Sequence, residues 1–200
     1  RWWAEVSKLE GIASRALQFA ALTAARSGEV RGAVWEEIDQ ETATWTISAA
    51  RMKSSREHRV PLSAEVIELL SDLPRIEGSP YIFSSARGGM LSDMSMSAVM
   101  KRLQKTEGKA GRSGFVDPRT NRSAVPHGLR STFRQWTAEQ GYPRDMAELA
   151  LAHVVGSEVE RAYQRSDMLE RRRKMMAAWA VFLRGESAVH PGARRLGVVE

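Results

Sequence analysis

Several polar residues in this sequence have types and spacings suited to chemistry on a phosphate group. Arg26 follows an apolar stretch in the run AARSGE, and Glu29 lies three residues further on, where its carboxylate can pair with the guanidinium. A cation at that end of a helix also complements the helix dipole, which is a purely structural interpretation of Arg26. Lys53 lies in a turn between two expected strands, where a lysine is usually a solvated charge.

Two histidines further along the chain stand at the ends of expected helices. His127 and Arg130, in PHGLR, share one face of the first turn of an expected helix. Backbone N–H groups at such a turn attract anions, so the pair indicates a phosphate site, although a capping histidine beside a surface arginine would give the same pattern. His153 ends the next helix and Tyr163 follows ten residues later, where a buried tyrosine with a hydrogen-bonded hydroxyl is the structural alternative.

Composition narrows the classes of function. The chain has 30 Lys and Arg against 24 Asp and Glu, for a net charge of +6, and 24 of the basic residues are Arg. The planar guanidinium suits phosphate, which favours a polyanion partner, although a GC-rich genome would also enrich Arg. The absence of Cys excludes disulfides, thiolate zinc sites and cysteine nucleophiles. His127 and His153 have no third ligand at suitable spacing, so we expect neither a metal nor a cofactor.

The elements that position these residues are mostly helical. A chain of 200 residues predicts one domain, and we expect it to be mainly α with a small antiparallel β-sheet. Ser27 should cap a short turn between Gly28 and Gly32, and no apolar run is long enough to span a membrane. The expected helices are 12–25, 63–73, 95–105, 127–140, 143–152, 157–164 and 168–183, the strands are 44–48 and 59–62, and 81–83 is extended. An exposed loop is expected at 107–126, and a flexible tail at 185–200.

The types and order of these residues resemble the tyrosine recombinase (phage integrase) family. AARSGE, a lysine turn before RVPL, HGLR, LAH and a following tyrosine stand in the family's order, and the resemblance covers about residues 12–183. It looks closest to the integrases of prophages and genomic islands. The resemblance implies the catalytic-domain fold for residues 1–184. The sequence starts with Arg1, and we expect it to be a piece of a longer protein whose N-terminal DNA-binding domains lie outside it.

The resemblance also implies what each residue does at the scissile phosphate. Arg26 and Arg130 bind the phosphate, and His153 hydrogen-bonds it. Glu29 matches an acidic position that acts on the first arginine and does not itself bind the phosphate. These charges suit a reaction at phosphorus, because preorganised donors stabilise the negative charge that develops in the transition state.

The remaining residues handle bonds and protons. Tyr163 is the nucleophile, and it must lose its proton as it attacks because a free tyrosine has a pKa near 10. By resemblance, His127 assists that proton transfer and Lys53 protonates the leaving 5′-oxygen. One departure is that His153 and Tyr163 are ten residues apart, where many members of the family have nine.

The function implied is site-specific integration or excision of a mobile element through a covalent 3′-phosphotyrosyl intermediate. The implied partners are double-stranded attachment-site DNA and three further copies in a homotetramer, with an excisionase or a host DNA-bending protein as accessory factors. The expected location is the bacterial cytoplasm, with the nucleoid. Two alternatives are a type IB topoisomerase-like enzyme, which relaxes supercoils, and a catalytically silent DNA-binding module.

Two further features have a functional and a structural interpretation. The cations of one helix and the loop after it can contact the DNA backbone, or they form a solvated basic face. These cations are Lys101, Arg102, Lys105, Lys109, Arg112, Arg119 and Arg122. The apolar residues of 167–183 can pack on their own core or dock on a neighbouring subunit, and we expect docking.

Overall fold

The computed structural model describes residues 1–117, 120–154 and 167–186. It confirms the expected fold class, which is mainly helical with one small antiparallel sheet. The helices are α1 (Trp2–Val6), α2 (Ile12–Thr23), α3 (Ser27–Arg31), α4 (Ala64–Ser71), α5 (Ser95–Lys109), α6 (Pro126–Glu139), α7 (Arg144–Ala150) and α9 (Leu169–Leu183). The expected helix at 157–164 and most of the expected tail lie outside the described residues. Within those residues, no helix combines the length and apolar character needed to cross a bilayer.

The sheet has three strands in the order β1–β2–β3, all antiparallel. β2 (Thr44–Ile47) and β3 (His58–Pro61) are the two expected strands, and the turn that carries Lys53 connects them. In their register, Trp45 lies opposite Val60 and Ile47 opposite His58. β1 (Ile38–Asp39) was not predicted, because two residues are too few to show an alternating pattern.

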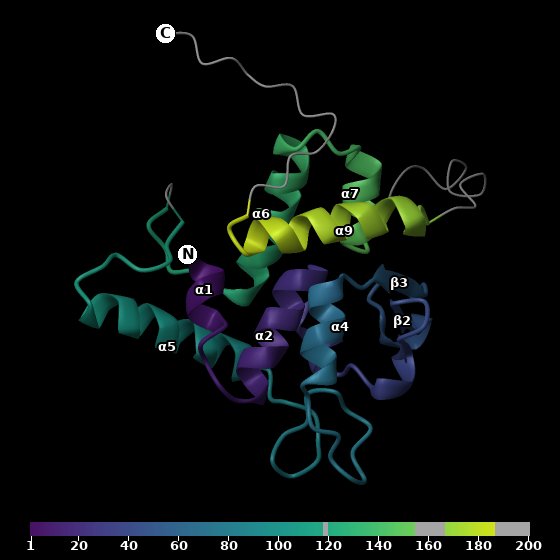
Figure 1. Cartoon of the computed structure of the whole chain (residues 1–200), viewed down its shortest axis with the longest axis horizontal. Helices are drawn as coiled ribbons and strands as arrows, with labels where there is room; N and C mark the ends of the chain where they lie inside the picture. The colour runs from purple at the N-terminus through teal and green to yellow at the C-terminus, as the bar shows by residue number, and fades with distance from the viewer. Residues whose placement is uncertain (118–119, 155–166, 187–200) are drawn as a thin grey trace, which may run out of the picture.

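α2 is the central helix, and it contacts α3, α4, α5, α6 and α9. On one side its Phe19 packs edge-to-face against Trp45 and Phe83, with ring centroids 5.1 and 5.2 Å away. Figure 1 shows α9 lying across the molecule in front of α6 and α7, with α2, α4 and the sheet below it. α9 belongs to this core, since the buried Trp179 indole donates a hydrogen bond to the Ala21 carbonyl at 2.7 Å.

Three expectations are corrected by the structure. α5 continues to Lys109, so the loop begins at Ala110, because Glu107 is buried and turns its carboxylate toward Arg112. The short helix α3 has Arg26 rather than Ser27 at its N-cap, because the Arg26 backbone N–H donates to the Glu29 carboxylate at 2.8 Å. The apolar face of α9 packs on the core of its own chain, through its methionines and Trp179, and is not left exposed for a neighbouring subunit.

Candidate active site

Arg26 and Glu29 form the first part of the site, in the turn between α2 and α3. The Arg26 guanidinium donates to the Glu29 carboxylate at 2.7 Å, and Glu29 is only 6% exposed. The other terminal nitrogen of Arg26 reaches the carbonyl of Ala152, beyond the end of α7, at 3.4 Å. Glu29 therefore holds the fork of Arg26 in one orientation and points it toward the segment that carries His153.

Arg130 lies on the buried face of α6 and is 5% exposed. Its guanidinium donates to the Ala24 carbonyl at 2.5 Å and to the Leu151 carbonyl at 2.7 Å. Among the described residues, no carboxylate forms an ion pair with it. Burial and the nearby charge of Arg26 lower the pKa of Arg130 to about 10, against the opposing effect of Glu29. The guanidinium is still charged at neutral pH, so it presents a positive charge without a direct counterion.

The backbone at two of these acceptors is unusual. Ala24 has φ 52° and Ala152 has φ 51°, both in the left-handed region that L-residues seldom adopt. Ala24 stands where α2 ends, and its carbonyl accepts from Arg130. Ala152 stands just beyond α7, and its carbonyl accepts from Arg26. Each arginine is thus anchored to the end of a helix other than its own.

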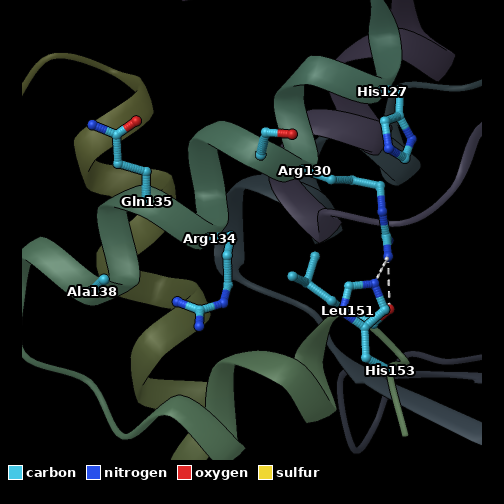
Figure 2. A pocket seen from close by; sticks show the side chains of 8 residues that line it. His127, Arg130, Arg134, Gln135, Ala138, Leu151 and His153 are labelled. Atoms are coloured by element: carbon cyan, nitrogen blue, oxygen red, sulfur yellow. Dashed lines mark hydrogen bonds between the residues drawn. The ribbon is translucent and has the colours of Figure 1, made fainter.

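The two histidines lie on either side of Arg130. Figure 2 shows His127 at the start of α6 and His153 beyond α7, with the Arg130 side chain extending between them. The Arg130 terminal nitrogen is 3.4 Å from His153 Nε2, and both histidines are exposed. His127, Arg130, Leu151 and His153 line one pocket, and Arg134 extends that pocket along α6. Exposed histidines beside a buried guanidinium suit an anion that enters from solvent.

Sequence reasoning missed a carboxylate at this pocket. Glu148, on α7, accepts a hydrogen bond from Arg134 Nε at 2.6 Å, and its other oxygen is 2.6 Å from His153 Nδ1. The available signals were weak: Arg134 stands four residues after Arg130 on the same helix, and Glu148 precedes His153 by five.

Lys53 lies in the exposed turn between β2 and β3, as expected. Within the described part of the chain, no residue forms a hydrogen bond or ion pair with its ammonium group. Two residues earlier, Arg51 is anchored instead: it forms an ion pair with Glu37 and donates to the Glu29 carbonyl at 2.6 Å. The structure therefore connects the base of the lysine turn to the residue that holds Arg26, while the lysine itself extends into solvent.

The other predicted residues are placed as follows. Tyr163, the expected nucleophile, and Arg119 both lie outside the described residues. Five of the predicted DNA-binding residues are exposed: Lys101, Arg102, Lys105, Lys109 and Arg122. Three of them, Arg102, Lys105 and Lys109, line a groove between α5 and the turn that follows α1.

Arg112 has a different environment. It makes a two-pronged contact with the buried Glu107 carboxylate, at 2.6 and 3.0 Å. Glu107 also lies 3.2 Å from the Arg1 guanidinium. Arg112 and Glu107 therefore join the end of α5 to the loop that follows it, and a phosphate would have to compete with a buried carboxylate for this arginine.

His58, on β3, is a half-buried ionisable group close to Arg130 and Glu29. Its ring donates a hydrogen bond to the Ala150 backbone at the end of α7. Burial and the charges of Arg172 and Arg130 lower the pKa of His58 to about 4, while the Glu29 charge and the Ala150 hydrogen bond raise it. The ring is thus neutral in the folded protein at physiological pH.

This shift predicts a loss of stability in mild acid. In the unfolded chain His58 takes up a proton near its ordinary pKa of 6.5, whereas in the folded protein its pKa is about 4. The contribution of His58 to stability therefore declines as the pH falls between those values. Between about pH 7 and about pH 5 the loss from this residue is about 2 kcal/mol. Urea unfolding of wild type and His58→Gln at both pH values measures it. An equal loss of stability in the two proteins would contradict the assignment.

Comparisons with solved structures identify the fold. The structure matches that of the integrase from mycobacterium phage Brujita with a TM-score of 0.59, 18% identity and coverage of 86% of this chain and 53% of that one. A lambda integrase dimer bound to a COC' core site matches with a TM-score of 0.52 and 20% identity, over 84% of this chain and 55% of that one. The fold is that of a tyrosine recombinase catalytic domain.

Sequence similarity identifies the family. The profile of the phage integrase family matches residues 6–170, and the chain belongs to this family. The prophage integrase IntA of Escherichia coli K12 is 41% identical over 162 residues, which are 80% of this chain and 36% of IntA. The chain spans well under half the length of the curated relatives it matches.

Proposed function

We propose that this chain is the catalytic domain of a site-specific DNA recombinase that cleaves and rejoins strands through a 3′-phosphotyrosyl intermediate. The observation that carries the proposal is the charge of Arg130. Its guanidinium is buried, bonded to backbone carbonyls, close enough to Arg26 to have its pKa lowered, and without a carboxylate partner among the described residues. A protein maintains such repulsion at a cost in stability, and a bound phosphodiester would relieve it.

The proposed reaction uses the positive charge of the site. Non-bridging oxygens of the scissile phosphate accept hydrogen bonds from Arg26, Arg130 and His153, and these donors stabilise the extra negative charge of the five-coordinate transition state. The two arginines and Glu29 are in place before DNA binds, so little reorganisation is needed during the reaction.

Bond exchange in this scheme is balanced. The Tyr163 oxygen attacks phosphorus and its proton passes to His127, while the bond to the 5′-oxygen breaks and that oxygen takes a proton from Lys53. The product is a phosphotyrosyl ester at the 3′ end and a free 5′-hydroxyl. A 5′-hydroxyl from the partner duplex then reverses the steps. Because the ester conserves the energy of the phosphodiester bond, rejoining needs no nucleotide cofactor.

Double-stranded DNA is the partner that these charges suit. Lambda integrase, which shares the fold, was solved on DNA. In our proposal the exposed cations of α5, with Arg119 and Arg122, contact phosphates and set the register of the duplex, whereas Arg112 serves the fold through Glu107. We further propose a homotetramer on attachment sites in the bacterial nucleoid, where an excisionase or a DNA-bending protein sets the direction.

The α5 contacts predict a change in the salt dependence of binding. Lys105→Gln removes one phosphate contact, so the slope of log K against log salt concentration should fall by about 0.9 on any duplex sequence. The Arg112→Gln protein is the matched comparison, and its slope should equal that of wild type because Glu107 already occupies this guanidinium. Fluorescence anisotropy over a salt series measures both. Equal slopes for Lys105→Gln and wild type would mean that Lys105 does not contact a DNA phosphate.

Covalent trapping tests the proposed function. A nicked suicide duplex with the junction sequence of the element that encodes the chain is incubated with the intact natural polypeptide, with the 200-residue chain, and with Tyr163→Phe in each. We expect an SDS-resistant DNA adduct that the tyrosine variant does not form. Relaxation of a plasmid without that sequence would indicate a type IB topoisomerase-like enzyme instead. DNA binding without any adduct, in either protein, would indicate a silent DNA-binding module.

A further inference from the structure

Glu148 stands between two basic groups from different parts of the fold. One carboxylate oxygen accepts from Arg134 Nε on α6, and the other lies 2.6 Å from His153 Nδ1 beyond the end of α7. Its side chain is 19% exposed. Burial raises the pKa of this carboxyl, but the hydrogen bonds from His153 and Arg134 outweigh burial and bring the pKa below its usual value. Glu148 is therefore a carboxylate at neutral pH.

The charge of Glu148 determines which nitrogen of His153 carries a proton. A carboxylate only accepts hydrogen bonds, so the proton in its 2.6 Å contact belongs to Nδ1. The other ring nitrogen, Nε2, then faces Arg130 across 3.4 Å, within the pocket. A second proton on Nε2 would turn it into a donor aimed at an anion bound by Arg130, and the Glu148 charge would balance the cationic ring.

An exposed histidine needs such a partner to keep one orientation. The His153 side chain is 45% exposed, and a ring in that environment turns readily about its last torsion. Figure 2 shows its ring beside the end of the Arg130 side chain, with Arg134 approaching from the next turn of α6. Arg134 holds the Glu148 oxygen that His153 does not use, so α6 supplies both the arginine of the site and the arginine that fixes this carboxylate.

We propose that Glu148 is a positioning residue for His153: it accepts a hydrogen bond from Nδ1 and so directs Nε2 toward the scissile phosphate, to which Nε2 donates when it carries a second proton. The proposal rests on the proposed function, because the phosphate is the group that Nε2 would meet. Glu148 touches no reacting atom in this scheme. It acts through the histidine, which distinguishes it from Arg26 and Arg130.

Two readouts test the role of Glu148 in the intact natural polypeptide. In single-turnover cleavage of the suicide duplex, Glu148→Gln should react about 10- to 100-fold more slowly than wild type, at nearly unchanged affinity for DNA. In nitrogen-15 NMR without DNA, the His153 ring should show one tautomer in wild type, protonated at Nδ1. Both tautomers should appear in Glu148→Gln, because an amide can accept or donate.

Two variants separate positioning from packing. Arg134→Gln removes the contact of Arg134 with Glu148, between α6 and α7, but keeps the contact of Glu148 with His153. The His153 ring of this variant should remain in one tautomer, and its DNA cleavage should be slowed less than that of Glu148→Gln. Glu139→Gln changes a carboxylate at the end of α6 that accepts from Gln135 and, among the described residues, has no contact with His153, so it should behave as wild type.

The outcomes are distinct. Wild-type cleavage by Glu148→Gln would overturn the proposal. So would a single Nδ1-protonated tautomer in that variant, or an equal loss of rate in Arg134→Gln. If wild type itself forms no adduct, the proposed function fails, while the NMR comparison still decides whether Glu148 fixes the ring.

Discussion

Replacing Arg130 with lysine should slow DNA cleavage by about 100- to 1000-fold, the usual cost of losing a preorganised donor to a developing charge. The substitution keeps a positive charge but removes the fork. A single ammonium group cannot donate to both the Ala24 and Leu151 carbonyls and also present N–H groups to a phosphate. One of these buried carbonyls would lose its partner, at a cost to folding of about 1–3 kcal/mol. Single-turnover cleavage and urea unfolding measure the two effects.

An exposed arginine on another helix provides the control for this variant. Arg144, the first residue of α7, is exposed, so Arg144→Lys should match wild type in both assays. If Arg130→Lys cleaved DNA at the wild-type rate, the scissile phosphate would not lie against this guanidinium. A loss of stability without a loss of cleavage rate would mean that Arg130 stabilises the fold but takes no part in the reaction.

The largest expected effect on stability is at Arg172, in the basic run at the start of α9. Its side chain is 1% exposed and donates to the carbonyls of Asp167 and Arg59 at 2.7 and 2.8 Å. Burial lowers the pKa of Arg172, while the Asp167 carboxylate, 3.2 Å away, opposes that shift. Arg172→Met should therefore reduce the free energy of unfolding by about 3–5 kcal/mol, because it leaves buried acceptors and a carboxylate without their partner.

The adjacent residue makes the comparison stringent. Arg171 is exposed, so Arg171→Met should change the free energy of unfolding by no more than about 0.5 kcal/mol. Urea unfolding, monitored by tryptophan fluorescence, compares the two variants under identical conditions. Similar losses in both would mean that Arg172 is not the link between β3 and the start of α9.

The elements with a strong local pattern could be predicted from the sequence. The apolar spacing of α2, the alternation of β2 and the glycine that follows α6 at position 141 all gave segments within a few residues of those observed. The boundaries that were wrong depend on tertiary contacts. α5 extends past its last regular apolar position because the buried Glu107 pairs with Arg112 and Arg1.

The same division holds for the candidate site. Arg26, Arg130 and His153 could be proposed from short motifs, and the structure brings these three together. Glu148 and His58 could not be found, since each acquires its role from a partner on another element. In the run Arg171–Lys174, four adjacent cations look alike in sequence, and only packing shows that Arg172 is buried.

The left-handed alanines at positions 24 and 152 affect how far the site can fluctuate. For an L-residue the left-handed region is a small well, whereas glycine moves through a wide range of angles there. Ala24 and Ala152, once in that well, have little room to swing the carbonyls that receive Arg130 and Arg26. Glycine at either place would relieve about 1–2 kcal/mol of backbone strain and keep every hydrogen-bonding atom. It would also widen the thermal motion of the one guanidinium group that bonds to that carbonyl, so a protein with less backbone strain would hold a bound anion less steadily.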